Sequence, residues 1–361
     1  MALLSRRTLA AVGLVAAGAA APLVAQTPSP APSPITVGGV VYAQWGAQLD
    51  SLSPANNFDV SRSYINVIGH FNSGIMTRIT ADIYRDGDAT AGGALLYRLK
   101  YAYAGWTPAG SAIGFRLGLT QTPFVDWEEA LWDYRMQGPV PVDRNGLMSS
   151  SDFGLAVDGS FSSEMFNFQA MAMNGENYNK TPGDSHKDFA ARASLRLLAT
   201  DEGSRVGGLR LTGYAQLGTP TSGGTRNRFI GLVSYRAKGV LLAGEYVASK
   251  DTVTNPAKIS TTGSIMSAYG WVKLPSTPVA IVGRVDIADP NTCSPATPPA
   301  ADCPASAGTD KRTTIIGGLS YQLSPNVRLL ADVDHTSFQT PTGGSAPKAI
   351  TQALFQTQFT F

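Results

Sequence analysis

The chain has 361 residues, of which 43% are hydrophobic and only 15% are charged, with 28 basic and 26 acidic side chains. No run of about 18 or more apolar residues follows the N-terminal segment, which excludes membrane-spanning helices from the rest of the chain. The near balance of basic and acidic residues predicts no nucleic-acid partner. Any electrostatic function must therefore depend on where the charges lie.

In chain order, the first predicted element is a secretory signal peptide at residues 1–25. Arg6 and Arg7 precede an apolar stretch at 8–21, and small residues typical of a cleavage site follow it. Removal of this segment takes away two basic residues and no acid, which leaves 26 basic and 26 acidic residues in the exported chain. Residues 26–34 alternate proline with small residues, which predicts an extended periplasmic spacer.

Residues 35–361 consist of short runs in which every second residue is apolar, a period typical of β-strands. The short connectors between these runs are at 72–74, 107–110, 162–163, 238–239, 275–276 and 324–326. The long polar connectors are at 51–59, 86–93, 120–151, 174–187, 250–262, 289–311 and 339–348. Since successive connectors alternate between two ends, the long ones share one end, as in up-and-down barrels of the bacterial outer membrane.

This alternation predicts an all-β fold, a transmembrane antiparallel up-and-down β-barrel of about 16 strands over residues 35–361. The predicted strands are 35–45, 62–71, 75–84, 95–103, 113–119, 153–161, 165–173, 189–200, 209–217, 228–238, 240–249, 265–274, 279–288, 313–323, 327–338 and 349–361. Near Ile230, Leu232 and Met266 both faces of the strand are apolar, so the sequence does not distinguish them there.

Charged residues within the strands alternate with apolar ones and are predicted to face the lumen, because an arginine facing lipid at the midplane costs about 2–4 kcal/mol. The basic ones are Arg62, Arg78, Arg98, Lys100, Arg116, Arg192, Arg196, Arg210, Arg228, Arg236, Arg284 and Arg328, and the acidic ones are Asp82, Asp158, Glu245, Asp286, Asp332 and Asp334. The excess of basic residues predicts a pore that prefers anions. The alternatives are a non-selective pore and a cation-preferring pore, because many barrels have inward-facing charges simply because their interior is wet.

Aromatic residues near strand ends are predicted to form the interfacial girdles that contact outer-membrane lipid and lipopolysaccharide. They are Trp45, Tyr103, Tyr235, Tyr246, Tyr269, Trp271 and Tyr321. Phe355, Phe359 and the final residue, Phe361, share one face of the last strand. A closing strand that ends on such an aromatic is typical of outer-membrane barrels, and we expect the barrel assembly machinery to bind this end.

The longest connector is predicted to fold into the lumen as a constriction loop at 121–151, because an unstructured loop of this length is unusual without a function. Its middle, 125–132, is expected to form a short helix. The charged residues of this loop that we assign to the site are Asp126, Glu128, Glu129, Asp133, Arg135 and Arg144. The alternative is a solvated cap outside the barrel.

Cys293 and Cys303 lie in one proline- and alanine-rich connector, and export to an oxidising compartment predicts a disulfide between them, with free thiols as the alternative. We expect no metal site, because no histidine lies in that connector and the three histidines have no ligand spacing. No cofactor is predicted either. The one cluster that suggests an enzyme is Asp332, Asp334, His335 and Ser337, but neighbouring strand residues face opposite sides, so we predict no enzyme.

Five segments resemble the phosphate-selective porin O and P family. They are RSYINVIGHF at 62–71, RITAD at 78–82, LKYAY at 99–103, RLGLTQTPF at 116–124 and DFGL at 152–155. The resemblance implies a sixteen-stranded porin, usually a homotrimer, in which the third loop narrows the channel and arginines guide anions. The chain departs from the family at two positions: Gln121 stands where the family usually has lysine, and Ser151 stands where an arginine often precedes the aspartate.

Together these features predict a porin of the bacterial outer membrane through which small hydrophilic solutes and ions, with a lean toward anions, diffuse passively. The alternative is a surface-anchoring or adhesin barrel without a conducting pore, since long external loops can also bind partners.

Overall fold

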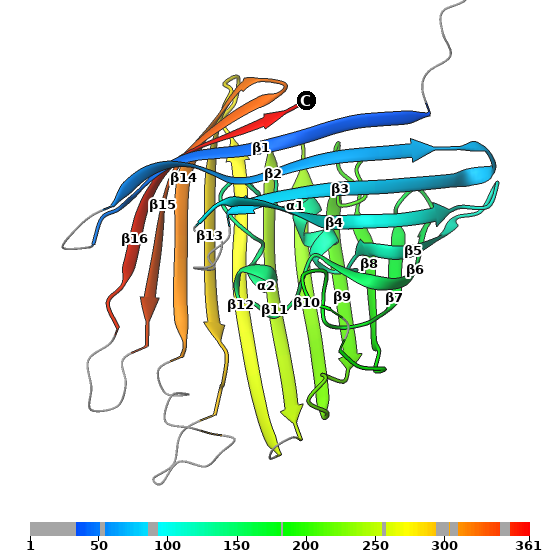
Figure 1. Cartoon of the computed structure of the whole chain (residues 1–361). Helices are drawn as coiled ribbons and strands as arrows, with labels where there is room; N and C mark the ends of the chain where they lie inside the picture. Colours follow the sequence, from blue (N-terminus) through cyan, green and yellow to red (C-terminus); the bar gives the residue numbers. More distant parts are fainter. Residues whose placement is uncertain are drawn as a thin grey trace, which may run out of the picture. The chain divides into compact units, whose positions relative to one another are not determined.

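The alternating runs of the sequence form sixteen antiparallel strands in the part of the chain that the structure describes (Figure 1). Each strand pairs with its neighbour in sequence, and β1 pairs with β16, so that the sheet closes into a barrel. This confirms the predicted fold class. The structure is a computed structural model that describes residues 34–50, 55–85, 93–181, 183–254, 258–293, 303, 310–339 and 347–361. The predicted signal peptide at 1–25 and all of the 26–34 spacer except Pro34 lie outside these residues.

The strands agree closely with the predicted ranges, and most differ by a few residues at their ends. They are β1 Ile35–Gln48, β2 Asn56–His70, β3 Ile75–Arg85, β4 Leu95–Trp106, β5 Ile113–Gln121, β6 Ser151–Phe161, β7 Phe166–Met173, β8 Asp188–Leu198, β9 Gly208–Gly218, β10 Thr225–Ala237, β11 Val240–Val253, β12 Ile259–Lys273, β13 Val279–Asp289, β14 Arg312–Ser324, β15 Val327–Phe338 and β16 Ile350–Thr360. The β11–β12 connector is shorter than predicted because both strands extend into it.

Three short helices accompany the strands among the described residues: η1 Asn72–Gly74 in a short turn, and α1 Val125–Leu131 and α2 Pro141–Arg144 in the long connector between β5 and β6. None of these helices is long and apolar enough to cross a membrane. The connector between β5 and β6, which we name L3, lies inside the barrel, as Figure 1 shows for α1 and α2. The predicted inward fold of the third loop and its short helix are therefore confirmed.

The outer face of the barrel is apolar. Leu117, Val37 and Tyr97 are exposed by 64–66% on this face, and large hydrophobic side chains on nearly every strand share the orientation. In water such a surface would favour association, but in a bilayer it contacts hydrocarbon. Closure of the sheet also leaves no unpaired edge, which is the condition for β-strands to span a membrane.

One irregularity of pairing changes the predicted faces of β4. Thr80 of β3 pairs with Tyr101, and Ala81 pairs with Leu99, so that Lys100 is an additional residue in a β-bulge. Lys100, Tyr101 and the following Tyr103 are consequently all buried inside the barrel, with 4–8% of their surface exposed. Strict alternation along the strand would place Tyr101 and Tyr103 on the outer face together with Leu99, but the bulge turns both tyrosines inward.

The predicted aromatic girdle is correct only in part. Tyr103, Tyr269 and Trp271 face the lumen, where Tyr269 packs against Trp132 and Trp271 lies near Arg236. The bulge at Lys100 explains why Tyr103 faces the lumen, and the apolar packing of L3 explains why Tyr269 does. The others lie on the outer face: Tyr246 and Tyr321 are exposed, Tyr235 pairs with the outward Leu242, and Trp45 lines an outer groove with Phe58 and Phe355.

The last strand closes the barrel with its aromatic residues outward. Phe355, Phe359 and Phe361 are exposed by 46–58%. The backbone N–H of Gly39 donates to the carbonyl oxygen of Phe361 at 2.9 Å, and Phe361 donates back to Gly39 at 3.1 Å. The seam between β1 and β16 thus reaches the final residue. Recognition of this end by the assembly machinery stays a prediction.

Candidate functional site in the barrel lumen

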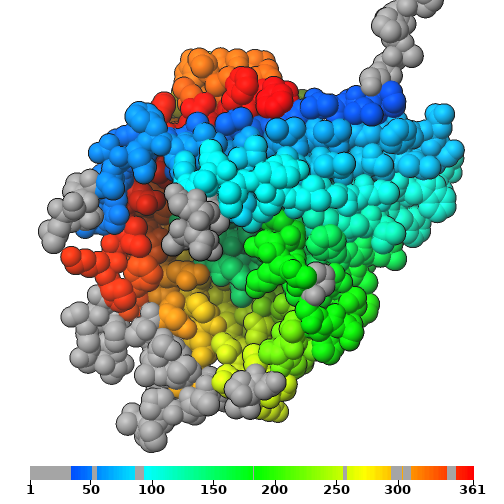
Figure 2. Space-filling view, in the orientation of Figure 1, coloured from blue at the N-terminus to red at the C-terminus, as the bar shows by residue number. Residues whose placement is uncertain are grey.

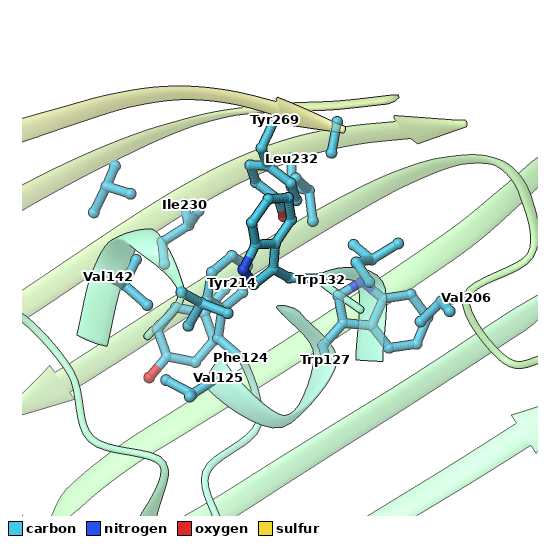
Figure 3. Packing of buried hydrophobic residues seen from close by; sticks show 14 of the residues in the cluster. Phe124, Val125, Trp127, Trp132, Val142, Val206, Tyr214, Ile230, Leu232 and Tyr269 are labelled. Carbon is cyan, nitrogen blue, oxygen red and sulfur yellow. The ribbon is translucent and has the colours of Figure 1, made fainter. Parts of the chain in front are cut away.

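An apolar cluster, of a kind that a solvent-exposed loop does not form, holds L3 in the lumen. Phe124, Trp127, Leu131 and Trp132 of L3 are at most 1% exposed. They pack against residues of the barrel wall, among them Tyr214 of β9, Ile230 and Leu232 of β10 and Tyr269 of β12 (Figure 3). The ring centroids of Phe124 and Tyr214 are 5.5 Å apart, and those of Trp132 and Tyr269 are 5.6 Å apart. This packing explains why β10 is apolar on both faces.

Arginines of the late strands bind the backbone of L3. Arg236 donates to the carbonyl oxygens of Ala130 and Leu131 at 3.2 and 3.0 Å, Arg284 to that of Pro139 at 2.6 Å, and Arg328 to that of Asp133 at 2.9 Å. Arg228 makes a longer contact, 3.4 Å, with the carbonyl oxygen of Leu147. Carbonyl groups of an irregular buried loop need such partners. We name these four arginines, on β10, β13 and β15, the anchor wall.

The basic residues of the early strands face the lumen, and most of them contact other residues of the barrel wall. We name Arg62, Arg78, Arg98, Lys100 and Arg116, on β2 to β5, the passage wall. Arg62 and Arg98 share the fully buried Asp82 at 3.1 and 2.8 Å, and Arg116 contacts Asp158 at 2.8 Å. Arg78 donates to the amide oxygen of Asn66 at 2.9 Å, and Lys100 lies 3.5 Å from Glu129 of L3. The Lys100–Glu129 pair crosses from the wall to the loop.

A cavity of about 430 Å³ lies on the side of L3 toward the long loops, and we name it the long-loop cavity. Figure 2 shows the molecule hollowed between the early and the late strands, with atoms of L3 inside. Of the described residues, seven basic ones line the cavity: Arg62, Arg98, Lys100, Arg135, Lys180, Arg226 and Arg228. The acidic ones that line it are Asp143 and Asp152. Asp82 and Asp188, which pair with three of these arginines, are fully buried behind them.

A second cavity, of about 460 Å³, lies on the side of L3 toward the short turns, and we name it the short-turn cavity. Its charged lining is balanced: Arg116, Arg192 and Arg205 face Asp126, Asp158 and Glu164. The two cavities have no lining residue in common over the described ranges, and L3 contributes to both. The basic surface is therefore confined to the long-loop side.

Of the twelve predicted pore-lining residues, Arg62, Arg98, Lys100 and Arg228 line the long-loop cavity, Arg116 and Arg192 line the short-turn cavity, and the other six line neither. Three of those outside the long-loop cavity lie near Trp127 or the short turns. Arg192 and Arg210 are buried beside the ring of Trp127, with guanidinium carbons 4.2 and 5.5 Å from its centroid, and Arg210 donates to the carbonyl oxygens of Gly207 and Glu164. Arg196 donates to the carbonyl oxygen of Ser163 at the short turns. Arg192 lines the short-turn cavity, whereas Arg196 and Arg210 hold backbone.

Of the six charged residues of L3 that we assigned to the site, all but one form ion pairs. Asp126 contacts Arg205 at 2.8 Å, Glu129 contacts Arg135 at 3.4 Å as well as Lys100, Asp133 contacts Arg236 at 3.0 Å, and Arg144 contacts Asp334 at 2.5 Å. The exception is Glu128, which is fully buried and whose two carboxyl oxygens have no hydrogen-bond partner of good geometry among the described residues. Burial, followed by the adjacent carboxyl of Glu245, raises the pKa of Glu128 well above its usual range.

Several lining residues were absent from the predicted set. They are Tyr178 and Lys180 in the β7–β8 loop, Arg205 between β8 and β9, and Arg226 on β10. Arg226 could have been assigned to the lumen from the sequence, because residues two apart on a strand share a face and Arg228 was already assigned there. The three others lie in connectors, where the sequence has no period that fixes a direction.

Cys293 and Cys303 form a disulfide in the structure. Asp334 faces L3 in the lumen, whereas His335 bonds to Thr351 across the strand pair, so these neighbours face different sides. Over the described ranges no group of three or more histidine, cysteine, aspartate or glutamate side chains could hold a metal ion.

Solved structures share this architecture although their sequences differ. The anion-selective porin from Comamonas acidovorans has a TM-score of 0.64 at 12% identity, over 91% of this chain and 99% of that one. The outer membrane channel DcaP of Acinetobacter baumannii has 0.59 at 10% identity, over 91% and 97%. A trimer form of OmpT, an outer membrane protein of Vibrio cholerae, has 0.57 at 13% identity, over 91% and 99%. The chain has the porin fold.

No protein-family model and no curated protein sequence matches the chain. The resemblance to the phosphate-selective porin O and P family therefore stays a prediction that rests on its five segments. The closed porin-fold barrel with its apolar exterior is that of a bacterial outer-membrane protein.

Proposed function

We propose that this protein is an outer-membrane porin through which small hydrophilic solutes and ions diffuse passively, with a preference for anions. The observation that supports the preference is the lining of the long-loop cavity, in which seven basic residues face the solute and their strongest acidic partners lie behind them. A low-dielectric wall focuses the field of such charges, and salt screens them only beyond about 8–10 Å.

Passage depends on binding that is weak enough to be reversed. Arg98 uses its Nε–H on Asp82, and no hydrogen bond of its two terminal nitrogens is present among the described residues. Arg62 uses one terminal nitrogen on the same carboxylate. Both guanidinium groups therefore keep donors for an anion, while Asp82 lowers their net attraction. An anion would exchange between them without strong capture.

The experiment is to measure reversal potentials in planar bilayers under a potassium chloride gradient. We expect Arg98→Glu together with Arg116→Glu to lower the ratio of chloride to potassium permeability several-fold, because each change reverses a charge on the passage wall. Lys238→Glu, in an exposed short turn outside both cavities, is the matched control. An unchanged reversal potential in the double variant would discard the anion preference.

A barrel without a conducting pore, which anchors or presents its loops, is the second candidate. The observation that favours it is that L3 separates the two cavities, which share no lining residue among the described ones, and that the Lys100–Glu129 pair joins the wall to L3. Stepwise conductance of the wild-type protein distinguishes the two. A porin gives steps, and a closed barrel gives none.

The remaining assignments follow from the proposal. Residues 1–25 would be removed as a signal peptide on export, 26–34 would be a periplasmic spacer, and L3 would be the constriction. We further propose a homotrimer, in line with the trimer form of the Vibrio cholerae relative, lipid and lipopolysaccharide around the outer face, and assembly through Phe361. Whether phosphate is selected over other anions is part of the same proposal and is tested by repeating the reversal potentials with phosphate.

A further inference from the structure

The loop between β7 and β8 enters the mouth of the lumen, and a buried carboxylate sets its path. Asp152, 2% exposed at the start of β6, accepts hydrogen bonds from the backbone N–H groups of Gly175 and Asn177 at 2.9 and 3.1 Å. Gly175 has φ +101°, and a Cβ there would lie 2.7 Å from Arg226 and 2.9 Å from Asp188. Only glycine fits this close approach. The loop is therefore positioned by the barrel wall.

This path brings Tyr178 over the passage wall. The guanidinium carbon of Arg98 lies 4.5 Å from the ring centroid of Tyr178 and 3.9 Å from that of Tyr84, so that it contacts a tyrosine of the loop and one of the wall. Stacking on two rings restricts the guanidinium in addition to its bond with Asp82. Burial raises the pKa of Tyr178 to about 12, so the hydroxyl stays neutral at pH 7 and adds no negative charge.

Two residues further along the loop, Lys180 lines the same cavity. Each of the six other basic residues that line it has a carboxylate partner: Arg62 and Arg98 have Asp82, Lys100 and Arg135 have Glu129, Arg226 has Asp188 and Arg228 has Asp251. Lys180 has no carboxylate within ion-pair distance in the described part of the chain. Its charge is thus the least compensated one at this end of the lumen.

We propose that the β7–β8 loop forms a second selectivity element for small hydrophilic anions at the long-loop end, with Lys180 as its specificity-determining residue and Tyr178 as the residue that positions Arg98. The proposal rests on the porin function proposed above and adds a location to it. Selection would begin before a solute reaches L3, and it would depend on a residue that belongs to no strand.

The first test is the reversal potential of Lys180→Glu in planar bilayers, expressed as its shift from wild type. Reversal of one uncompensated charge at a cavity of this size should lower the chloride-to-potassium permeability ratio by about two- to threefold at 0.1 M salt. The matched control is Lys187→Glu in the same loop, because the Lys187 side chain binds the carbonyl oxygens of Ser185 and His186 and lines neither cavity.

A second variant changes the path of the loop but no charge. Gly175→Ala should displace the loop and move the reversal potential in the same direction as Lys180→Glu, while Tyr178→Phe, which keeps the ring, should leave it at the wild-type value. A reversal potential that stays at the wild-type value in Lys180→Glu, or that shifts equally in Lys187→Glu, would overturn the proposal.

A third measurement separates this inference from the porin function itself. The chain has two cysteines, and they are bonded to each other, so Lys180→Cys introduces a single free thiol. We expect a negatively charged thiol reagent to react several-fold faster there, relative to a positively charged one, than at Lys187→Cys. This ratio reports the local potential even in a barrel that does not conduct. Equal ratios at the two positions would reject the inference, whereas the absence of wild-type conductance would reject only the porin.

Discussion

The passage wall and the anchor wall have the same sequence pattern but different roles. In both, basic residues alternate with apolar ones along strands that face the lumen. On the passage wall the arginines pair with carboxylates at the edge of open space, as Arg62 and Arg98 do with Asp82. On the anchor wall they donate to backbone carbonyls of L3, as Arg236 and Arg328 do. An arginine that faces the lumen is therefore not necessarily a pore-lining one, because the position of L3 inside the barrel decides which arginines can contact solute.

Of the substitutions that test the difference between the two walls, replacement of Arg284 is expected to have the largest effect on stability. This side chain and Asp286 are at most 2% exposed, and Arg284 binds both oxygens of Asp286 at 2.9–3.0 Å as well as the carbonyl of Pro139. Arg284→Met leaves the Asp286 charge buried and unpaired, which costs about 3–5 kcal/mol. We expect a lower midpoint for heat unfolding in detergent, followed by gel mobility, and unstable single-channel currents.

Its control is the double variant Arg284→Met with Asp286→Leu, which removes both charges and should recover most of the lost stability. The corresponding change on the passage wall, Arg98→Met, should alter the reversal potential and barely alter the unfolding midpoint, because the buried Asp82 still pairs with Arg62. If Arg284→Met unfolds like wild type and conducts quietly, the division into two walls is wrong.

The next effect is a pH dependence of the position of L3. Glu128 of α1 faces Glu245 of β11, Tyr269 of β12 and the Arg284–Asp286 pair of β13. Because its pKa is raised, the Glu128 carboxyl keeps its proton while L3 is docked. In a released, solvated loop the same carboxyl would lose its proton near its ordinary pKa of 4.5. The stability of the docked loop is thus complete below pH 4.5 and decreases as the pH rises toward the raised pKa, by about 1.4 kcal/mol per unit of pH.

We therefore expect wild-type current fluctuations to increase from acid to alkaline pH, and Glu128→Gln, which resembles the protonated form, to remove this dependence. Glu129→Gln changes the neighbouring carboxylate, which pairs with Lys100 and Arg135 instead, and should keep the pH dependence. Fluctuations that rise with pH equally in Glu128→Gln would show that another group controls the loop.

Most of the barrel could be predicted from the sequence because its physical rule is local. Each strand must expose apolar residues to lipid on alternate positions, and that period can be read without knowledge of the neighbours. The rule failed at Tyr101 and Tyr103, where a single bulged residue, Lys100, changes the faces, and at Tyr269, where L3 provides an apolar environment inside the barrel. Such features depend on tertiary contacts.

The site was less predictable for the same reason. The sequence pattern predicts that the basic residues face the lumen. It does not tell that Arg236 binds the backbone of Ala130, 106 residues earlier, or that Asp152 directs the β7–β8 loop. Lys180 and Arg205 belong to connectors without periodicity. Their contribution appears only when the loops are in position.

The smallest effect is expected at the Lys100–Glu129 pair, which joins the passage wall to L3. Lys100→Gln and Glu129→Gln remove opposite charges from the same crossing of the lumen. Lys100→Gln should lower the chloride-to-potassium permeability ratio and Glu129→Gln should raise it, each by about twofold at 0.1 M salt. If the pair only seals the lumen, both variants would instead raise conductance without a change in selectivity. Reversal potential and conductance, measured on the same channels, distinguish the two outcomes. The permeability ratio changes in opposite directions in the two variants only if the charges of the pair are exposed to the solute.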